Sequence, residues 1–311
     1  MTPPRLVLVL SENWTMTSPR DLRGLARMGA EAEDAGFDAV MLSEHVVLGP
    51  SAEENGPMPN PREYALPGNQ DPATPWPSSL ILLGAIAQIT TALRLMAVAV
   101  IPPLRHPLQM AKDLATLDLL AEGRLVALPT VSWHEDEYAA LGVPFRERGA
   151  RLDDHLAAWH ALWGPSPAAF EGRHYAFGDV WCEPKPFREG RIDLHFGGST
   201  LHDKLLARIV RYASGFNPLG QPKPEEMERL RVAMAAAGRD IAELELVGGV
   251  RARFTDATSP ADLADALESI PSQMERGFSS FCIKPSQFTD DARDLGRFCR
   301  EAVARVEALT S

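Results

Sequence analysis

The sequence predicts a single (β/α)8 TIM barrel, a closed sheet of eight parallel strands ringed by helices. Short apolar runs alternate with amphipathic segments along the chain, and the runs are continuous, as in strands buried on both faces. The length of 311 residues suits one barrel domain over residues 1–311. An open doubly wound sheet is the rival, but the sequence lacks the GxGxxG fingerprint that would follow its first strand.

Eight segments are predicted to be the barrel strands, and the sixth has the weakest pattern. They are residues 5–10, 38–43, 93–100, 124–130, 191–198, 214–219, 244–254 and 279–285. Helical segments lie between them, and Gly36 and Gly123 follow two of these, where glycine commonly ends a helix. Apolar residues at helical spacing mark residues 107–121 (Met110, Leu114, Leu117, Leu120) and 146–163 (Leu152, Leu156, Trp159, Trp163).

Two segments interrupt the alternation and are predicted to be long insertions. Residues 46–77 are rich in proline, have little periodicity and are longer than an ordinary connection. Because they follow the second strand, they should extend a loop at the face where barrels place active sites, and form a lid there. Trp76 and Met58 are the expected apolar contacts of this lid. Residues 164–190 are predicted to form an inserted hairpin.

The composition excludes several classes of partner. A net charge of -11 and a pI near 5.3 argue against nucleic acid and membrane as partners and leave a small-molecule substrate. No apolar run reaches the roughly 20 residues of a membrane span, and the N-terminal apolar run is too short for a signal peptide. Cys182, Cys282 and Cys299 are odd in number and widely spaced, which indicates reduced thiols in a cytoplasmic protein.

The stretch SWHEDEYAALG (132–142) begins as the zinc-protease helix motif HExxH begins, but Tyr138 stands where the second His should be. Tyrosine is a poor zinc ligand, and the eight His residues form no convincing ligand pair, so no metal site is expected. Ser132 and Glu135 instead fit a capping box at the start of a helix.

Glu44 and His45 end the second predicted strand, where a barrel displays catalytic side chains. A carboxylate beside an imidazole can orient the ring or raise its pKa, which makes a general acid near neutral pH. A hydrogen-bonded pair that only caps the strand is the structural alternative.

Two further segments could bind an anion. Arg105 and His106 follow the third strand in the segment LRHP, although His-Pro is also ordinary chemistry for the start of a helix. FGGST (196–200) ends the fifth strand and leads to a helix whose N-cap is predicted at Ser199 or Thr200. Backbone N–H groups and the helix dipole there could hold a phosphate, and a plain tight turn is the alternative.

Several motifs in order resemble the bacterial luciferase-like monooxygenase superfamily: AEDAGFDAVMLSEHVVLG, the segment from LRLMAVAV to HALW, EPKPF and HFGGST. The resemblance covers residues 5–220 and implies a TIM barrel that binds FMN or the deazaflavin F420 at its C-terminal face. It places His45 beside the flavin ring as a proton donor or substrate contact, with Glu44 as its neighbour. It also implies a non-prolyl cis peptide near Val98–Ala99 and a homodimer.

The resemblance further assigns residues to the cofactor and to the substrate. Trp14 and Trp76 are expected to contact the substrate. The family usually has a glycine-rich run after the fourth strand, where this chain has LPTVSW (128–133), and the bulkier side chains predict a narrower cofactor groove. The residues expected to bind the cofactor are Ala97, Val98, Ala99, Thr130, Ser132, Trp133, Gly197, Gly198 and Ser199.

Three classes of function are compatible with these features. The first is an oxidoreductase that transfers a hydride between F420 and a small organic substrate, with His45 managing the proton, or else an FMN-dependent monooxygenase. The second is a degenerate, non-catalytic binding barrel, motivated by the missing glycines. The third is a cofactor-free lyase or isomerase that uses Glu44 and His45 as an acid–base pair.

Among cofactors, the sequence favours F420 over FMN. A histidine at the end of the second strand suits hydride transfer from a deazaflavin, which does not activate oxygen readily. Most of the 31 basic residues are arginine, a bias of GC-rich genomes and so of bacteria that make F420. The anionic tail of F420 could meet local positive charge, because local charge outweighs net charge within a Debye length of about 8 Å. The candidate residues are Arg105, Lys204, Arg208 and Lys223.

Overall fold

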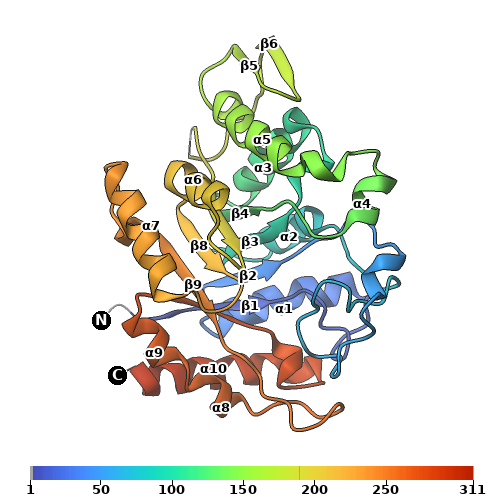
Figure 1. Ribbon diagram of the computed structural model, residues 1–311. Helices are drawn as coiled ribbons and strands as arrows, with labels where there is room; N and C mark the ends of the chain where they lie inside the picture. Colours follow the sequence, from blue (N-terminus) through green and yellow to red (C-terminus); the bar gives the residue numbers. More distant parts are fainter. Residues whose placement is uncertain (1–2, 189, 311) are drawn as a thin grey trace. The chain divides into compact units, whose positions relative to one another are not determined.

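A computed structural model describes residues 3–188 and 190–310 and shows a closed barrel of eight parallel strands (Figure 1). The neighbours around the barrel run β1-β10-β9-β8-β7-β4-β3-β2, which confirms the predicted barrel and excludes the open sheet. All eight predicted strands are present, including the sixth. They are β1 (Arg5–Val9), β2 (Ala39–Leu42), β3 (Arg94–Val100), β4 (Leu125–Pro129), β7 (Asp193–Gly198), β8 (Gly215–Pro218), β9 (Glu245–Gly249) and β10 (Ser280–Ile283).

The strand boundaries differ from the prediction mainly at β9. The predicted strand reached residue 254, whereas β9 ends at Gly249. Arg251 and Arg253 beyond it are exposed, so this part of the segment has no buried face that would continue the strand.

Ten α-helices are found in the described part of the chain. None of the described helices is both long enough and apolar enough to cross a membrane. Gly36 and Gly123 follow α1 and α3 with φ of 93° and 79°, the left-handed conformation in which glycine ends a helix. The helices are α1 (Leu22–Asp34), α2 (Ser79–Ala87), α3 (Pro107–Leu120), α4 (Glu135–Ala140), α5 (Arg148–Trp163), α6 (Asp203–Tyr212), α7 (Pro224–Ala236), α8 (Leu263–Leu267), α9 (Ile270–Glu275) and α10 (Leu295–Thr310).

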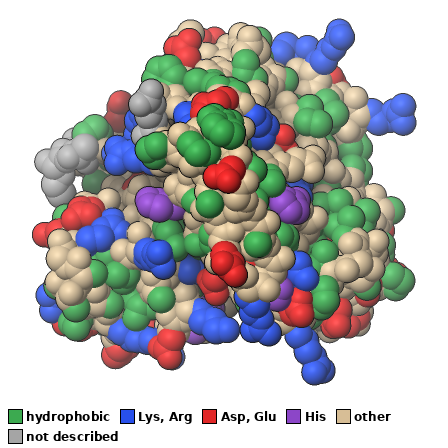
Figure 2. All heavy atoms as spheres, turned by 90° about the horizontal axis from the view of Figure 1, so that it is seen from above, with side chains coloured by type: hydrophobic (Ala, Val, Ile, Leu, Met, Phe, Trp, Pro, Cys, Tyr) green, Lys and Arg blue, Asp and Glu red, His purple; other side chains and the backbone are tan. Residues whose placement is uncertain are grey.

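By its contacts the chain divides into two compact units, and each is described by itself. One unit is Leu42–Ile192, and the other combines Met1–Met41 with Asp193–Ser311. The prediction of one domain over residues 1–311 stays a prediction. On the face drawn in Figure 2, acidic and basic side chains are interspersed, so the acidic chain does not gather its charge into one patch on that face.

In the unit Leu42–Ile192, α3 and α5 pack against each other through large apolar side chains. Trp159 and Trp163 stack with ring centroids 5.5 Å apart, and the indole N–H of Trp163 donates to the Ala111 carbonyl at 3.1 Å. The predicted stripes are buried except for Leu120, which is 46% exposed. At 100° per residue Leu120 lies about 80° away from Met110 around the helix, so the prediction for Leu120 was wrong.

The same unit contains both predicted insertions. Residues 164–190 form a hairpin of β5 (Ala168–Glu171) and antiparallel β6 (Ala176–Val180), which Figure 1 shows beyond α5. Residues 46–77 hold one short 3-10 helix, Pro50–Glu53, and are otherwise irregular. This loop is closed on itself, because the Asn55 N–H donates to the Gly68 carbonyl at 2.7 Å and the Gln70 N–H to the Ala52 carbonyl at 2.8 Å.

In the other unit, β1 pairs with β10 and β2, with Leu8 opposite both Ile283 and Val40. α1 and α10 lie side by side outside these strands (Figure 1). β7 pairs with β8, and Gly215 of β8 lies beside the ring of His195, since a Cβ at Gly215 would come within 2.3 Å of His195 Nε2. A larger residue at 215 would therefore push a buried imidazole out of place.

His155 is a buried histidine that makes the folded protein sensitive to acid. On α5, its Nδ1 lies 2.8 Å from the Arg151 carbonyl and its Nε2 lies 3.1 Å from the Arg105 carbonyl. Burial lowers its pKa from 6.5 to about 4. Because the folded-state pKa is the lower one, the unfolded chain binds the proton first as pH falls, and stability present above pH 6.5 is lost toward pH 4.

We expect His155→Gln to flatten this pH dependence. The wild type should lose up to about 2–3 kcal/mol more unfolding free energy than the variant between pH 7 and pH 4.5, from about 1.4 kcal/mol per pKa unit. Urea unfolding at the two pH values measures the difference. His160→Gln, an exposed histidine on the same helix, is the control and should follow the wild type. Parallel pH dependence in His155→Gln and the wild type would contradict the assignment.

Candidate active site

His45 follows β2 in the unit Leu42–Ile192 and lies among aromatic rings. Its ring centroid is 5.1 Å from that of Trp76, 5.7 Å from that of Trp133 and 6.1 Å from that of His134, all in edge-on arrangements. The His45 side chain keeps 8% of its surface exposed. The imidazole is therefore largely shielded from bulk water, which strengthens any charged contact that it makes.

The carboxylate that contacts His45 belongs to Glu137, not to Glu44. Glu137 Oε2 lies 3.4 Å from His45 Nδ1, and the Glu137 side chain is fully buried. The same carboxylate accepts from the Val46 N–H at 2.5 Å and from the Ser132 hydroxyl at 3.3 Å. Because a carboxylate oxygen is an acceptor, this contact favours the tautomer with its hydrogen on Nδ1 and leaves Nε2 to take or give a proton.

Sequence reasoning missed Glu137. It is one of three consecutive acidic residues at the start of α4, and nothing in their order separates the buried Glu137 from the exposed Glu135. Its role depends on a contact across 92 positions in the sequence. Only the burial of Glu137 beside Tyr138 on the inner face of the helix identifies it.

Glu44 pairs with Arg105 instead. The two oxygens of Glu44 accept from the two terminal nitrogens of Arg105 at 2.8 and 2.9 Å. Glu44 Oε1 also accepts from the Ile101 N–H at 2.7 Å, and Oε2 from the Ser79 hydroxyl at 3.4 Å. These contacts tie the end of β2 to the segment after β3, in line with the structural alternative for Glu44.

The residues around His134 fix the start of the 46–77 loop. His134 Nε2 accepts from the Gly49 N–H at 2.7 Å, and Asp136 accepts from the Ser51 N–H at 2.9 Å. Burial lowers the pKa of His134, which favours the neutral ring that this acceptor role needs. Position 49 requires glycine, because a Cβ there would lie 2.5 Å from the Asp136 Cβ.

The capping box predicted at the start of this helix was wrong. α4 begins at Glu135 with His134 as its N-cap and has no side-chain cap, so Ser132 and Glu135 do not form a capping box. The Ser132 hydroxyl reaches Glu137 instead, from a backbone with φ of 57°. The Tyr138 hydroxyl donates to the Val131 carbonyl at 2.5 Å, and burial raises its pKa.

The segments expected beside the cofactor ring adjoin one another in the same unit. β3 and β4 pair with Val98 opposite Leu128, and the expected cis peptide is present between Val98 and Ala99. The Ser43 hydroxyl donates to the Val98 carbonyl at 2.7 Å. The Thr130 N–H donates to the Val100 carbonyl at 2.8 Å. Of the expected residues, this unit holds Glu44, His45, Trp76, Ala97, Val98, Ala99, Thr130, Ser132 and Trp133.

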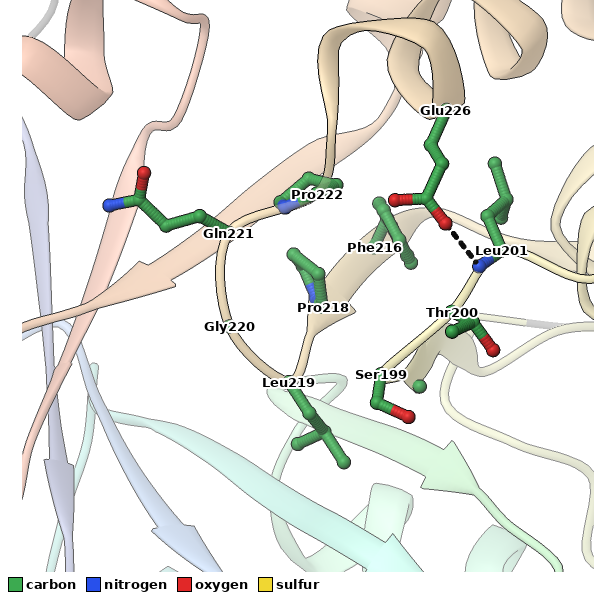
Figure 3. Close-up of a pocket in the computed structure, with 11 residues that line it drawn as sticks. Ser199, Thr200, Leu201, Phe216, Pro218, Leu219, Gly220, Gln221, Pro222 and Glu226 are labelled. Atoms are coloured by element: carbon green, nitrogen blue, oxygen red, sulfur yellow. Dashed lines mark hydrogen bonds between the residues drawn. The ribbon is translucent and has the colours of Figure 1, made fainter.

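The FGGST segment lies in the other unit and lines a small pocket there (Figure 3). Gly197 and Gly198 end β7, and the pocket has a volume of about 20 Å³, room for about one water-sized group. Helix α6 begins three residues beyond Thr200, with His202 as its N-cap accepting from the Leu205 N–H at 3.2 Å. The N-cap predicted at Ser199 or Thr200 was therefore wrong.

A carboxylate of the protein already occupies part of this pocket. Figure 3 shows Glu226 reaching from α7 to Leu201, whose N–H it accepts at 3.0 Å. Its other oxygen accepts from the Lys223 N–H at 3.0 Å, and these two bonds, the one from Leu201 first, lower the pKa of Glu226. An anionic ligand at this loop would have to lie to the side of Glu226.

The remaining expected residues have different surroundings. Trp14, after β1, belongs to the unit with FGGST, and its buried indole N–H makes no hydrogen bond within residues 3–188 and 190–310. Of the four cations expected at an anionic tail, Lys204 and Lys223 are exposed, whereas Arg208 is buried and Arg105 is held by Glu44. Contact of these four residues with an anionic tail stays a prediction, and the two exposed lysines are the better placed of them.

Comparison with known proteins gives both sequence relatives and similar folds. A model of the family of luciferase-like monooxygenases matches residues 4–297. An uncharacterized protein of Mycobacterium tuberculosis is 32% identical over 213 residues, which are 67% of this chain and 73% of that protein. The FMNH2-dependent dimethylsulfone monooxygenase of Pseudomonas putida is 27% identical over 207 residues, 65% of this chain and 56% of that enzyme.

Among solved structures, an F420-dependent secondary alcohol dehydrogenase in complex with an F420–acetone adduct has the same fold. Its TM-score is 0.73 at 15% identity, with 98% of this chain and 99% of that chain covered. At this identity the likeness extends to the barrel and not to the reaction. The family match spans nearly the whole sequence, and the chain belongs to the luciferase-like monooxygenase family.

Proposed function

We propose that this protein is an oxidoreductase that transfers a hydride between F420 and a small organic substrate. The observation that carries the proposal is the contact of His45 with the buried Glu137 inside a cluster of aromatic rings at the end of β2. A histidine held in one orientation, with one ring nitrogen committed and shielded from water, is suited to proton transfer.

The residues of the unit Leu42–Ile192 fit a flavin-type ring. The buried indole N–H of Trp76 makes no hydrogen bond to any described residue, and a ring carbonyl or a substrate oxygen could accept from it. When bound, the cofactor supplies the hydride donor or acceptor. The groups that would hold its ring are Ala97, Val98, Ala99, Thr130, Ser132 and Trp133. Gly197, Gly198 and Ser199 stay predicted cofactor-binding residues.

In the reaction, His45 Nε2 gives a proton to the substrate oxygen during reduction and takes it back during oxidation. Glu137 accepts the Nδ1 hydrogen, which fixes the tautomer and stabilises the ring when Nε2 is protonated. Glu44 acts as a positioning group, because its bonds to Arg105 and Ile101 hold the strand end that carries His45. Trp133 and Trp76 exclude water from the imidazole.

The runner-up is an FMN-dependent monooxygenase. It is favoured by the finding that two of the four cations expected at an F420 tail are engaged within the fold, since Arg208 is buried and Arg105 is paired with Glu44. F420 is supported by the exposed Lys204 and Lys223. The bulky LPTVSW segment was the reason for considering a non-catalytic barrel. In the structure its Trp133 packs against His45 and its Ser132 donates to Glu137, so these larger side chains support the position of the histidine.

Three further features belong to the proposal. The 46–77 loop, with Met58 and Trp76, forms a fixed rim that helps to select the substrate, since its start is bonded to α4. A homodimer is proposed from family membership, and light scattering would test it. The cysteines Cys182, Cys282 and Cys299 are free and buried, which is compatible with a cytoplasmic protein.

Cofactor choice can be tested by titrating the protein with F420 and with FMN at low and high salt. We expect F420 to bind more tightly at low salt, with a lead that shrinks as salt screens its anionic tail. Lys204→Gln with Lys223→Gln should weaken F420 more than FMN. Tighter FMN binding, or oxygen-dependent turnover with reduced FMN, would replace F420 by FMN. Binding of neither would leave the lyase and binding-barrel hypotheses.

The His45–Glu137 pair can be tested with three variants. His45→Ala should keep the circular dichroism spectrum and the cofactor affinity. Turnover is measured with the reduced or oxidised cofactor and a panel of small alcohols and ketones. It should fall at least about tenfold, since acid–base groups contribute about 10²–10⁴-fold. Glu137→Gln should lower turnover and also shift its pH profile, whereas the exposed neighbour Glu135→Gln should do neither. An unchanged pH profile in Glu137→Gln would show that Glu137 is only structural.

A further inference from the structure

The segments that follow β1 and β10 come together inside the unit made of residues 1–41 and 193–311. The two strands pair with Leu8 opposite Ile283. Beyond them, the Asn13 side-chain oxygen accepts from the Ser286 N–H at 3.2 Å, and its amide nitrogen donates to the Val9 carbonyl at 2.8 Å. Asn13 is fully buried, so it fastens residues 12–15 to residues 284–287.

The loop after β1 is held in one conformation. Glu12 has φ of 55°, a left-handed conformation that non-glycine residues rarely adopt. The Asn13 carbonyl accepts from the N–H groups of Met16 at 3.0 Å and Thr17 at 3.1 Å, which closes a tight turn. The side chains on this turn are therefore placed before any ligand binds.

Four buried polar atoms in these two segments have no hydrogen-bond partner among the described residues. They are Trp14 Nε1, Thr15 Oγ1, Ser286 Oγ and Gln287 Oε1. Ser286 is fully buried and Gln287 is 3% exposed. A buried polar group without a partner costs about 1–3 kcal/mol, so four of them in two short adjoining segments call for a ligand that completes them.

The chemistry of these atoms defines the ligand. The indole N–H can only donate, the amide oxygen can only accept, and the two hydroxyls can do both. The two charged neighbours have opposite charges: Lys284 is 1% exposed and interacts electrostatically with Glu12. Burial lowers the pKa of Lys284. A neutral group that both donates and accepts fits this set, whereas an anion would leave Gln287 Oε1 facing another acceptor.

We infer that the segments 12–15 and 284–287 form a binding site, within this unit, for a neutral hydroxylated small molecule. The ligand hydroxyl accepts from Trp14 Nε1 and donates to Gln287 Oε1, with Thr15 and Ser286 able to complete either bond. The ligand class is hydroxylated neutral molecules, such as diols and hydroxyketones, and the inference does not depend on the proposed reaction at His45. Acceptor-only molecules such as a sulfone leave Gln287 unpaired and are discriminated against.

The subsite makes opposite predictions for stability and for binding. Thr15→Val and Ser286→Ala remove unpaired polar atoms, so each should raise the Tm of the ligand-free protein by about 1–3 °C, since about 1 kcal/mol shifts Tm by a few degrees. Thr90→Val is the matched control. The Thr90 hydroxyl is buried, donates to the Ile86 carbonyl at 2.8 Å and accepts from Arg124 at 3.1 Å, so this variant should lower the Tm.

Binding is measured by ligand-observed NMR with 1,2-propanediol and dimethyl sulfone as probes, with and without the cofactor. The wild type should bind the diol at least about tenfold more tightly than the sulfone, the factor of about 1.4 kcal/mol. Gln287→Leu and Thr15→Val should lose that preference, and Thr90→Val should keep it. Sulfone binding equal to diol binding, no diol binding in either state, or a lower Tm in both Thr15→Val and Ser286→Ala would overturn the subsite.

Titration of the same variants with F420 and FMN separates the two proposals. Unchanged cofactor affinity together with lost diol preference supports the subsite. If the wild type binds neither cofactor but prefers the diol, and Gln287→Leu loses this preference, the proposed reaction fails and the hydroxyl subsite stands.

Discussion

The ion pair of Glu44 with Arg105 is the interaction on which the candidate site depends. It joins the end of β2 to the turn after β3 with two charge-assisted bonds, and the Ile101 N–H adds a third to the same carboxylate. The Arg105 backbone is itself held, since its carbonyl contacts His155 Nε2 at 3.1 Å and the Tyr175 hydroxyl at 3.5 Å. Loss of one partner of such a buried pair typically costs about 3–5 kcal/mol, less where one partner is partly exposed, as Arg105 is at 24%.

This arrangement separates two tasks between two neighbouring residues. Glu44 fastens the strand end, and His45, the next residue, is left to face Glu137 and the tryptophans. Glu137 also binds the Val46 N–H, so one carboxylate orients both the histidine ring and the backbone that follows it. The position of the imidazole is thus determined from both sides of the chain.

More of the fold than of the candidate site could be predicted from the sequence. The strands could be located because buried strands in a barrel are continuous apolar runs, a local signal that does not depend on distant residues. Glu44 and His45 could be identified by position, but their partners could not. Whether an acidic residue contacts Arg105 or His45 is decided by side chains that lie 61 and 92 positions apart in the sequence.

The same limit explains the other differences. Ser132 has the spacing of a capping residue, yet its left-handed backbone directs the hydroxyl to Glu137. FGGST has the composition of an anion loop, yet a glutamate 25 positions away accepts the Leu201 N–H. In both cases a local pattern predicted a helix cap that the structure places elsewhere, and a tertiary contact chose the partner of the polar group.

The 46–77 loop is fastened near both of its ends, by His134 and Asp136 at Gly49 and Ser51, and by the bond from Gln70 to Ala52. Between these fastenings Asn60 and Arg62 are also buried, so the middle of the loop is packed and is not an exposed tip. A change of length near residues 57–66 therefore costs more than the closure entropy, which is about 0.6 kcal/mol per doubling of loop length, because it also displaces these buried side chains.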